Sequence, residues 1–199
     1  MFLEKVINKA DKVGWIEVIC GSMFSGKTEE LIRRIRRVKL AKQKVKVFKP
    51  KRDTRYNKKK IISHDSNTIK SKSVSSSNKI IKLSENFDVI GIDEVQFFDD
   101  GIVDVCNALA NSGKRVIVAG LDMDYKGKPF GQMPNLLAIA EYVTKVHAVC
   151  TKTGKMANYT NRIVDSDELI LLGDTKKYEA LSRKAFNKIN NLSKFKKSN

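Results

Sequence analysis

Short apolar runs recur along the first two thirds of the chain and predict the strands of a buried sheet. These runs lie at residues 15–21, 44–50, 87–94 and 114–122. Between them, 28–41 and 101–113 space their apolar residues as amphipathic helices do, and Gly113 closes the second helix. Strands that alternate with helices predict an α/β fold with a parallel sheet.

The last third of the chain has a different pattern. Residues 143–150 predict one more strand, and the strand-like runs 154–164 and 168–173 are joined by a polar turn, which is typical of a β-hairpin. Residues 177–189 have helical spacing. We therefore expect a main nucleotide-binding domain over 1–149, a small lobe over 150–190 and a flexible tail over 191–199. Residues 51–79 are polar and predict a mobile loop.

Composition narrows the class of protein. The chain has 199 residues, 41% of them hydrophobic, which is enough for one domain with a small appendage. Cys20, Cys106 and Cys150 are too few for a disulfide framework and fit a reducing compartment. The sequence contains neither an apolar run of about 18 residues nor a signal-peptide core. We therefore expect a cytoplasmic protein without a membrane partner.

The formal net charge of +17 is spread unevenly. Between Arg33 and Lys60, fifteen Lys and Arg residues stand against one acid, Asp53. This stretch fits lysines accumulated by an A+T-rich genome, a patch that attracts an anionic small molecule, or a nucleic-acid surface. The three interpretations stay open on charge alone.

Residues 21–28 carry a phosphate-binding motif, GSMFSGKT, of the form G-x-x-x-x-G-K-T. It follows a predicted strand and opens a predicted helix, which is the context that the motif requires. Its glycines let backbone N–H groups turn toward phosphate oxygens at the positive end of the helix. Lys27 would reach the β- and γ-phosphates, and the Thr28 hydroxyl would bind Mg²⁺. The fold class is therefore that of a P-loop NTPase, a parallel sheet with flanking helices plus a small C-terminal β-hairpin lobe.

The apolar strand 87–94 ends in two carboxylates, Asp93 and Glu94. In P-loop proteins a strand end of this kind lies beside the phosphate loop, where Asp93 would hold hydrated Mg²⁺. Glu94 could then accept a proton from a nucleophile near the γ-phosphate. That nucleophile is water in an ATPase and an alcohol in a kinase, and these two residues alone do not choose between them.

Weaker candidates carry less specific signals. Arg55, close to Asp53, could stabilise charge on a transferring phosphoryl group, although a loop arginine is more often solvated. His64 stands alone and is more often a structural or surface residue. Cys150 begins a turn that falls short of a zinc knuckle, because no second pair of Cys or His residues follows it.

Several segments together go beyond a generic phosphate loop. GSMFSGKTEELIRR, FKPKRDTRY, SHD, IGIDEVQFF, the run from VAGLDMDYKGKPFG to HAVC, and YTNRI resemble the type II thymidine kinases in order and spacing. The resemblance runs from about Trp15 to Arg183. It implies transfer of the γ-phosphate of ATP, with Mg²⁺, to the 5′-hydroxyl of thymidine or deoxyuridine, giving dTMP from thymidine in nucleotide salvage for DNA synthesis.

The resemblance also implies roles for residues and an assembly. Glu94 would be the general base, Thr28 and Asp93 would bind Mg²⁺, the aspartate through water, and Asp53 with Arg55 would act near the phosphates. ATP would contact Gly21, Ser22, Met23, Phe24, Ser25, Gly26, Lys27, Thr28, Asp93, Glu94, Val95 and Gln96. The nucleoside would contact Met23, Phe97, Leu121, Tyr125, Phe130, Thr160, Leu169, Ile170, Leu171, Leu172, Gly173 and Tyr178. The segment from Leu169 to Gly173 would cover the base and bond it through the backbone. The family is usually a homotetramer.

One departure from the family pattern concerns zinc. The family has a C-x-x-C pair and a second pair of ligands, whereas this chain has Cys150, Thr153, Ser182 and Ala185 at the matching places. Since three of the four ligands are missing, zinc is not expected and packing must hold the lobe together.

Three functions remain to be weighed. They are a deoxynucleoside kinase, a P-loop ATPase stimulated by nucleic acid, and a nucleotide-binding module without turnover. An ATPase motor usually needs a longer chain and an arginine finger, and a module without turnover would not need Glu94. The resemblance favours the kinase, with ATP and thymidine as partners and no nucleic acid.

Overall fold

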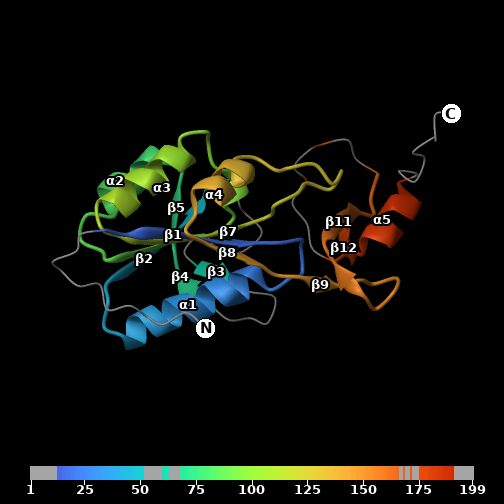
Figure 1. Cartoon of the computed structure of the whole chain (residues 1–199), viewed down its shortest axis with the longest axis horizontal. Helices are drawn as coiled ribbons and strands as arrows, with labels where there is room; N and C mark the ends of the chain where they lie inside the picture. The colour runs from blue at the N-terminus through green and yellow to red at the C-terminus, as the bar shows by residue number, and fades with distance from the viewer. Residues whose placement is uncertain are drawn as a thin grey trace.

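Six parallel strands form the main sheet in the order β5-β2-β6-β7-β1-β8 (Figure 1). The computed structural model describes residues 13–51, 60–62, 68–165, 168, 171 and 175–190. The sheet strands are β1 (Trp15–Cys20), β2 (Val45–Pro50), β5 (Lys72–Val74), β6 (Val89–Ile92), β7 (Arg115–Gly120) and β8 (Tyr142–Lys145). The parallel α/β sheet expected from the apolar runs is confirmed.

Helices cover both faces of this sheet. Helix α1 (Lys27–Leu40) packs on one face, while α2 (Asn78–Leu83), α3 (Ile102–Asn111) and α4 (Met133–Ile139) lie on the other (Figure 1). Successive residues of β1 point to opposite faces, so Ile19 packs with α1 while Val18 packs with α3 and α4. This alternation explains why the sheet strands are apolar at nearly every position.

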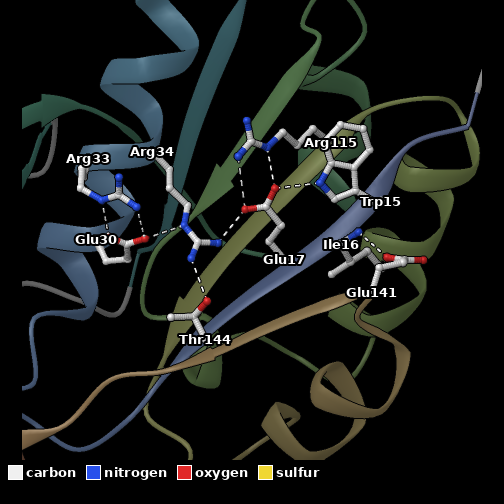
Figure 2. Close-up of polar contacts among 9 residues, drawn as sticks. All are labelled: Trp15, Ile16, Glu17, Glu30, Arg33, Arg34, Arg115, Glu141 and Thr144. Carbon is white, nitrogen blue, oxygen red and sulfur yellow. Dashed lines mark hydrogen bonds and ion pairs between the residues drawn. The ribbon is translucent and has the colours of Figure 1, made fainter. Parts of the chain in front are cut away.

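A buried cluster of charges ties α1 to the sheet (Figure 2). The carboxylate of Glu17 on β1 accepts from Arg34 of α1 at 2.6 Å and from Arg115 of β7 at 2.6 Å, and all three side chains are at least nine-tenths buried. Arg34 also donates to Thr144 on β8 at 2.8 Å, and Trp15 donates its indole N–H to Glu17 at 2.7 Å. The helix that carries the phosphate loop is thus fixed to three adjacent strands.

The C-terminal lobe comprises β9 (Ala148–Val149), β10 (Met156–Ala157), β11 (Tyr159–Arg162), β12 (Tyr178–Leu181) and α5 (Arg183–Ile189). It lies at the carboxyl end of the main sheet (Figure 1). The rings of Tyr159 and Phe186 stack at 4.5 Å and join its strands to α5. The division of the chain at residue 149 stays our proposal.

The lobe differs from the sequence prediction in its pairing. Strand β11 pairs with β12, and β10 pairs with β9, so no hairpin joins 154–164 to 168–173 among the described residues. The predicted helix 177–189 is wrong in its first turn, because β12 occupies 178–181 and Ser182 then caps α5 by accepting from the N–H of Ala185. The predicted strand 143–150 is two strands, β8 and β9, which belong to different sheets.

The polar stretch 51–79 contains more structure than predicted. It includes β3 (Lys60–Ile62), β4 (Thr68–Lys70), β5 and the start of α2, and β3 pairs with β4. Strands of three residues are too short to show a period, which is why the pattern predicted a loop. Residues 52–59 and 63–67 of this stretch, and the predicted tail over 191–199, lie outside the described residues, so the expected mobility stays a prediction. None of the helices in the described part is long and apolar enough to cross a membrane.

Candidate active site

The phosphate loop, residues 21–28, joins β1 to α1 at the carboxyl edge of the sheet. Gly26 has a φ of 85° and stands at the N-terminus of α1. A Cβ atom on Gly21 would lie 2.2 Å from the carbonyl oxygen of Val146, so only glycine fits there. The Lys27 ammonium and the Ser25 hydroxyl both donate to the carbonyl oxygen of Ser22, at 2.6 and 2.8 Å. The loop therefore has the backbone form that the motif predicts.

Thr28 and Asp93 meet beside this loop. The Thr28 hydroxyl lies 3.5 and 3.4 Å from the two carboxylate oxygens of Asp93, whose side chain is buried. The backbone N–H of Asp93 donates to the carbonyl of Phe48, which fixes the end of β6 against β2. A hydroxyl and a carboxylate supply the oxygen ligands that Mg²⁺ prefers while leaving room for water and phosphate oxygens. The two residues fit a magnesium ion bound with a nucleotide.

Glu94 follows directly and has an unusual backbone. Its φ of 52° lies in the left-handed region, which costs a non-glycine residue about 1–2 kcal/mol. Its carboxylate accepts from the side-chain N–H of Gln96 at 2.6 Å. The side-chain oxygen of Gln96 accepts from the backbone N–H of Leu121 at 3.1 Å. Gln96 thus connects the carboxylate at the end of β6 to the segment that follows β7. Backbone strain of this kind is concentrated at functional sites.

Four of the candidate nucleoside residues meet in two pairs. The N–H of Met23 donates to the Thr160 hydroxyl on β11 at 2.9 Å, which links the loop to the C-terminal lobe. Phe97 and Phe130 meet edge to face at 5.6 Å between ring centroids. These contacts join residues up to 137 positions apart in the chain.

A third group surrounds Tyr125 and Tyr178. The Tyr178 hydroxyl donates to the backbone carbonyl of Leu171 at 2.6 Å. Arg162, which was not singled out from the sequence, lies with its guanidinium carbon 3.6 Å from the centre of the Tyr125 ring and donates to the Tyr178 hydroxyl at 3.0 Å. Nothing local in the sequence predicts this contact, because the three residues come from separate segments.

Other candidates lie in regions that the structure does not describe. These are Asp53, Arg55, His64, Leu169, Ile170, Leu172 and Gly173. Val95 is fully buried and Gln96 is 3% exposed, and their expected contact with ATP stays a prediction. The roles of all the site residues stay predictions.

Comparison with known proteins decides the family. The family model described as thymidine kinase matches residues 14–186. The chain belongs to the thymidine kinase family. It is 56% identical over 186 residues to a thymidine kinase of Bacteroides fragilis and 55% identical over 186 residues to one of Bacteroides thetaiotaomicron, with 94% of each chain covered. It is 53% identical over 181 residues to a thymidine kinase of Rhodothermus sp., covering 91% of this chain and 85% of the relative.

The metal turn that resemblance to thymidine kinases implies does not fit zinc in this chain. Cys150 is the one thiol among the four matching residues; Thr153 and Ser182 offer hydroxyls and Ala185 a methyl group. Burial raises the pKa of the Cys150 thiol, but hydrogen bonds with the side chains of Thr153 and Ser182 and with backbone N–H groups lower it to about 6 overall. In the described part of the chain, no three His, Cys, Asp or Glu side chains gather as metal ligands. Structural zinc needs four such ligands.

Proposed function

We propose that this member of the thymidine kinase family transfers the γ-phosphoryl group of ATP to the 5′-hydroxyl of thymidine or deoxyuridine, producing the nucleoside 5′-monophosphate for DNA synthesis. One observation carries the proposal. A complete phosphate loop, the Thr28–Asp93 pair and the Glu94 carboxylate adjoin a group of aromatic side chains at one edge of the sheet. Phosphate chemistry and a planar, apolar binding surface are thereby combined in one place.

The phosphate side performs the transfer by positioning and charge. The N–H groups of residues 21–28 and the Lys27 ammonium bind the phosphate oxygens and offset the charge that builds up on them. The Thr28 hydroxyl and, through water, Asp93 would hold Mg²⁺, which would offset the negative charge of the β- and γ-phosphates. In our proposal the Glu94 carboxylate accepts the proton of the attacking 5′-hydroxyl as the new P–O bond forms. ADP leaves with the electrons of the broken P–O bond.

The nucleoside side supplies binding and orientation. Met23, Phe97, Leu121, Phe130 and Thr160 would surround the base and sugar. Tyr125, Tyr178 and the segment from Leu169 to Gly173 would complete this side. The resemblance supports Asp53 and Arg55 as residues that act near the transferring phosphoryl group.

A nucleic-acid-stimulated ATPase is the competing function, and one assay separates it from the kinase. ADP release should rise steeply when thymidine is added with MgATP, and thymidine 5′-monophosphate should accumulate in equal amount. Turnover that ignores thymidine but increases with DNA would favour the ATPase. Absence of turnover under every condition would favour a binding module.

We also propose that the protein acts in the cytoplasm as a homotetramer. The three cysteines are buried free thiols, which fits a reducing compartment. Burial raises the pKa of Cys20 to about 11, with a further contribution from Asp122, and burial raises that of Cys106 to about 12, so these two thiols are protonated at neutral pH. Light scattering after size-exclusion chromatography measures the assembly directly.

A further inference from the structure

Arg162, the last residue of β11, contacts three separate parts of the nucleoside side. Its guanidinium stacks on the Tyr125 ring at 3.6 Å and lies 5.5 Å from the centre of the Tyr178 ring. It donates one hydrogen bond to the Tyr178 hydroxyl at 3.0 Å and another to the backbone carbonyl of Glu168. The Tyr178 hydroxyl in turn donates to the carbonyl of Leu171. One side chain therefore joins the segment after β7, the start of β12 and the backbone at 168 and 171.

The chemistry of these contacts requires a guanidinium group. A planar cation attracts the face of an aromatic ring within about 6 Å. Arginine can stack on one ring while its N–H groups donate in fixed directions in its own plane, whereas lysine offers a point charge on a flexible stem. The contacts with Tyr125, Tyr178 and Glu168 use both properties at once.

Strand β11 directs Arg162 toward the site. Residues two apart in a strand point to the same face, so Arg162 shares a face with Thr160, whose hydroxyl accepts from the N–H of Met23 in the phosphate loop. Tyr159 and Asn161 point to the other face, where Tyr159 stacks on Phe186 of α5. One face of β11 thus holds the lobe together, and the opposite face adjoins the phosphate loop and the two tyrosines.

The segment that bears Tyr125 is itself a tight turn. The carboxylate of Asp124 accepts from the N–H groups of Lys126 and Lys128 at 2.8 and 2.9 Å, and the N–H of Gly127 donates to the Asp124 carbonyl at 3.0 Å. These bonds fix the backbone on both sides of Tyr125 and do not involve its ring. The Lys126 ammonium lies 5.4 Å from the centre of that ring, and the Arg162 guanidinium is closer, at 3.6 Å.

We propose that Arg162 is a positioning residue for the nucleoside. It holds the rings of Tyr125 and Tyr178 in one arrangement and so sets the affinity for thymidine without touching the reacting atoms. The inference rests on the proposed thymidine kinase function. It assigns to this side chain a role in substrate affinity and none in phosphoryl transfer.

Steady-state kinetics of Arg162→Met test the proposal. Methionine keeps an unbranched side chain but removes the planar charge and both hydrogen bonds. We expect the KM for thymidine to rise about tenfold or more, while kcat at saturating thymidine and the KM for ATP change less than about twofold. Arg162→Lys should behave like Arg162→Met, because charge alone does not reproduce the stack and the two bonds.

Arg183→Met is the matched control. Arg183 lies 5.1 Å from the centre of the Tyr159 ring and makes the same type of contact on the α5 side of the lobe. We expect the KM for thymidine of this variant to equal that of the wild type. Tyr178→Phe, combined with Arg162→Met, should raise the KM by less than the product of the two single effects, since both remove the same hydrogen bond.

The outcomes distinguish a failure of the proposed kinase function from a failure of the positioning role of Arg162. A wild-type enzyme without thymidine-dependent ADP release would refute the proposed function. An active wild type with an unchanged thymidine KM in Arg162→Met, an equal rise in Arg183→Met, or full rescue by lysine would each overturn the positioning role. If Arg162→Met does not fold, Arg162→Lys decides the question by itself, because a wild-type thymidine KM in that variant overturns the positioning role.

Discussion

On the phosphate side of the site, the described residues expected to act fall into two short segments, which follow β1 and β6. Residues 21–28 form one loop, and Asp93 and Glu94 are consecutive. On the nucleoside side, Thr160 meets Met23 across 137 positions, and Arg162 contacts both Tyr125 and Tyr178. The first side is built from two short motifs, and the second is an assembly of single residues from distant segments.

The two sides also differ in how they are supported. The helix behind the phosphate loop is fixed to the sheet by the buried Glu17, Arg34 and Arg115 cluster (Figure 2). The C-terminal lobe is held by the Tyr159–Phe186 stack and by backbone hydrogen bonds, with no comparable buried ion pair among its described residues. We therefore expect changes on the phosphate side to remove chemistry or stability. Changes on the nucleoside side should alter affinity.

Lys27→Ala should have the largest effect. It removes the ammonium group from the phosphate loop, and kcat/KM should fall by about 10³-fold or more because the charge on the transferring phosphoryl group loses its main protein counter-charge. Circular dichroism should report an unchanged fold. Lys39→Ala, an exposed lysine on the same helix, is the matched control and should keep full activity. Near-native turnover in Lys27→Ala would contradict the assignment of the loop.

Glu94→Gln should lower kcat by about 10²-fold or more, because a glutamine cannot take a proton at neutral pH. Its amide still has one acceptor for the bond from Gln96, so the local structure should be retained. The affinity for MgATP should change little, since Lys27, Thr28 and Asp93 remain. A large rise in KM with kcat retained would instead mean that Glu94 holds the nucleoside or the metal.

Two neighbouring arginines test the support behind the phosphate loop. Arg34 and Arg33 both pair with Glu30, but the Arg34 side chain is 4% exposed and that of Arg33 is 57% exposed. Arg34→Gln leaves Glu17 with less counter-charge in the interior and should cost about 3 kcal/mol of unfolding free energy. Arg33→Gln should cost under about 1 kcal/mol. Urea unfolding of both variants measures the two free energies of unfolding. Equal losses of stability would show that burial does not determine how much each arginine contributes.

The same cluster predicts a pH dependence. Burial raises the pKa of Glu17, but the hydrogen bonds and charges of Arg115, with Trp15 and Arg34, lower it overall below its usual value of 4.5. A carboxyl with a lowered pKa stabilises the fold above its unfolded pKa, and this contribution is lost as pH falls through the folded pKa. The stability gap between wild type and Arg34→Gln should therefore be constant near neutral pH and narrow below about pH 4.5. A gap that widens on acidification would contradict the cluster's role.

Sequence predicted the parts of the molecule that depend on local pattern. The strands β1, β2, β6 and β7, the helices α1 and α3, and the phosphate loop have periods or motifs that a short window contains. The Glu17–Arg34–Arg115 cluster was not predicted, because its members lie on three elements and only the fold brings them together. The pattern predicts helix over β12, because the strand lasts only four residues before Ser182 starts α5. The role of Arg162 is not predicted for the same reason, because only the fold brings its partners Tyr125 and Tyr178 together.

Removal of zinc by a chelator should have no effect, the smallest among these predictions. The experiment tests whether packing or a metal ion holds the C-terminal lobe together. The turn at Cys150 is closed by backbone hydrogen bonds, since the N–H groups of Thr153 and Gly154 both donate to the Cys150 carbonyl, at 3.3 and 2.9 Å. The Cys150 thiol contacts the hydroxyl groups of Thr153 and Ser182, at positions where a zinc site would need thiolates. A domain that depends on structural zinc unfolds when the metal is removed. A zinc-selective chelator, with Mg²⁺ in excess, should leave the unfolding temperature and thymidine phosphorylation unchanged.

A variant with cysteine at Thr153, Ser182 and Ala185 is the control, and it should take up about one zinc ion and become sensitive to the chelator. One equivalent of zinc in the purified wild-type protein would show that the lobe is held by metal after all.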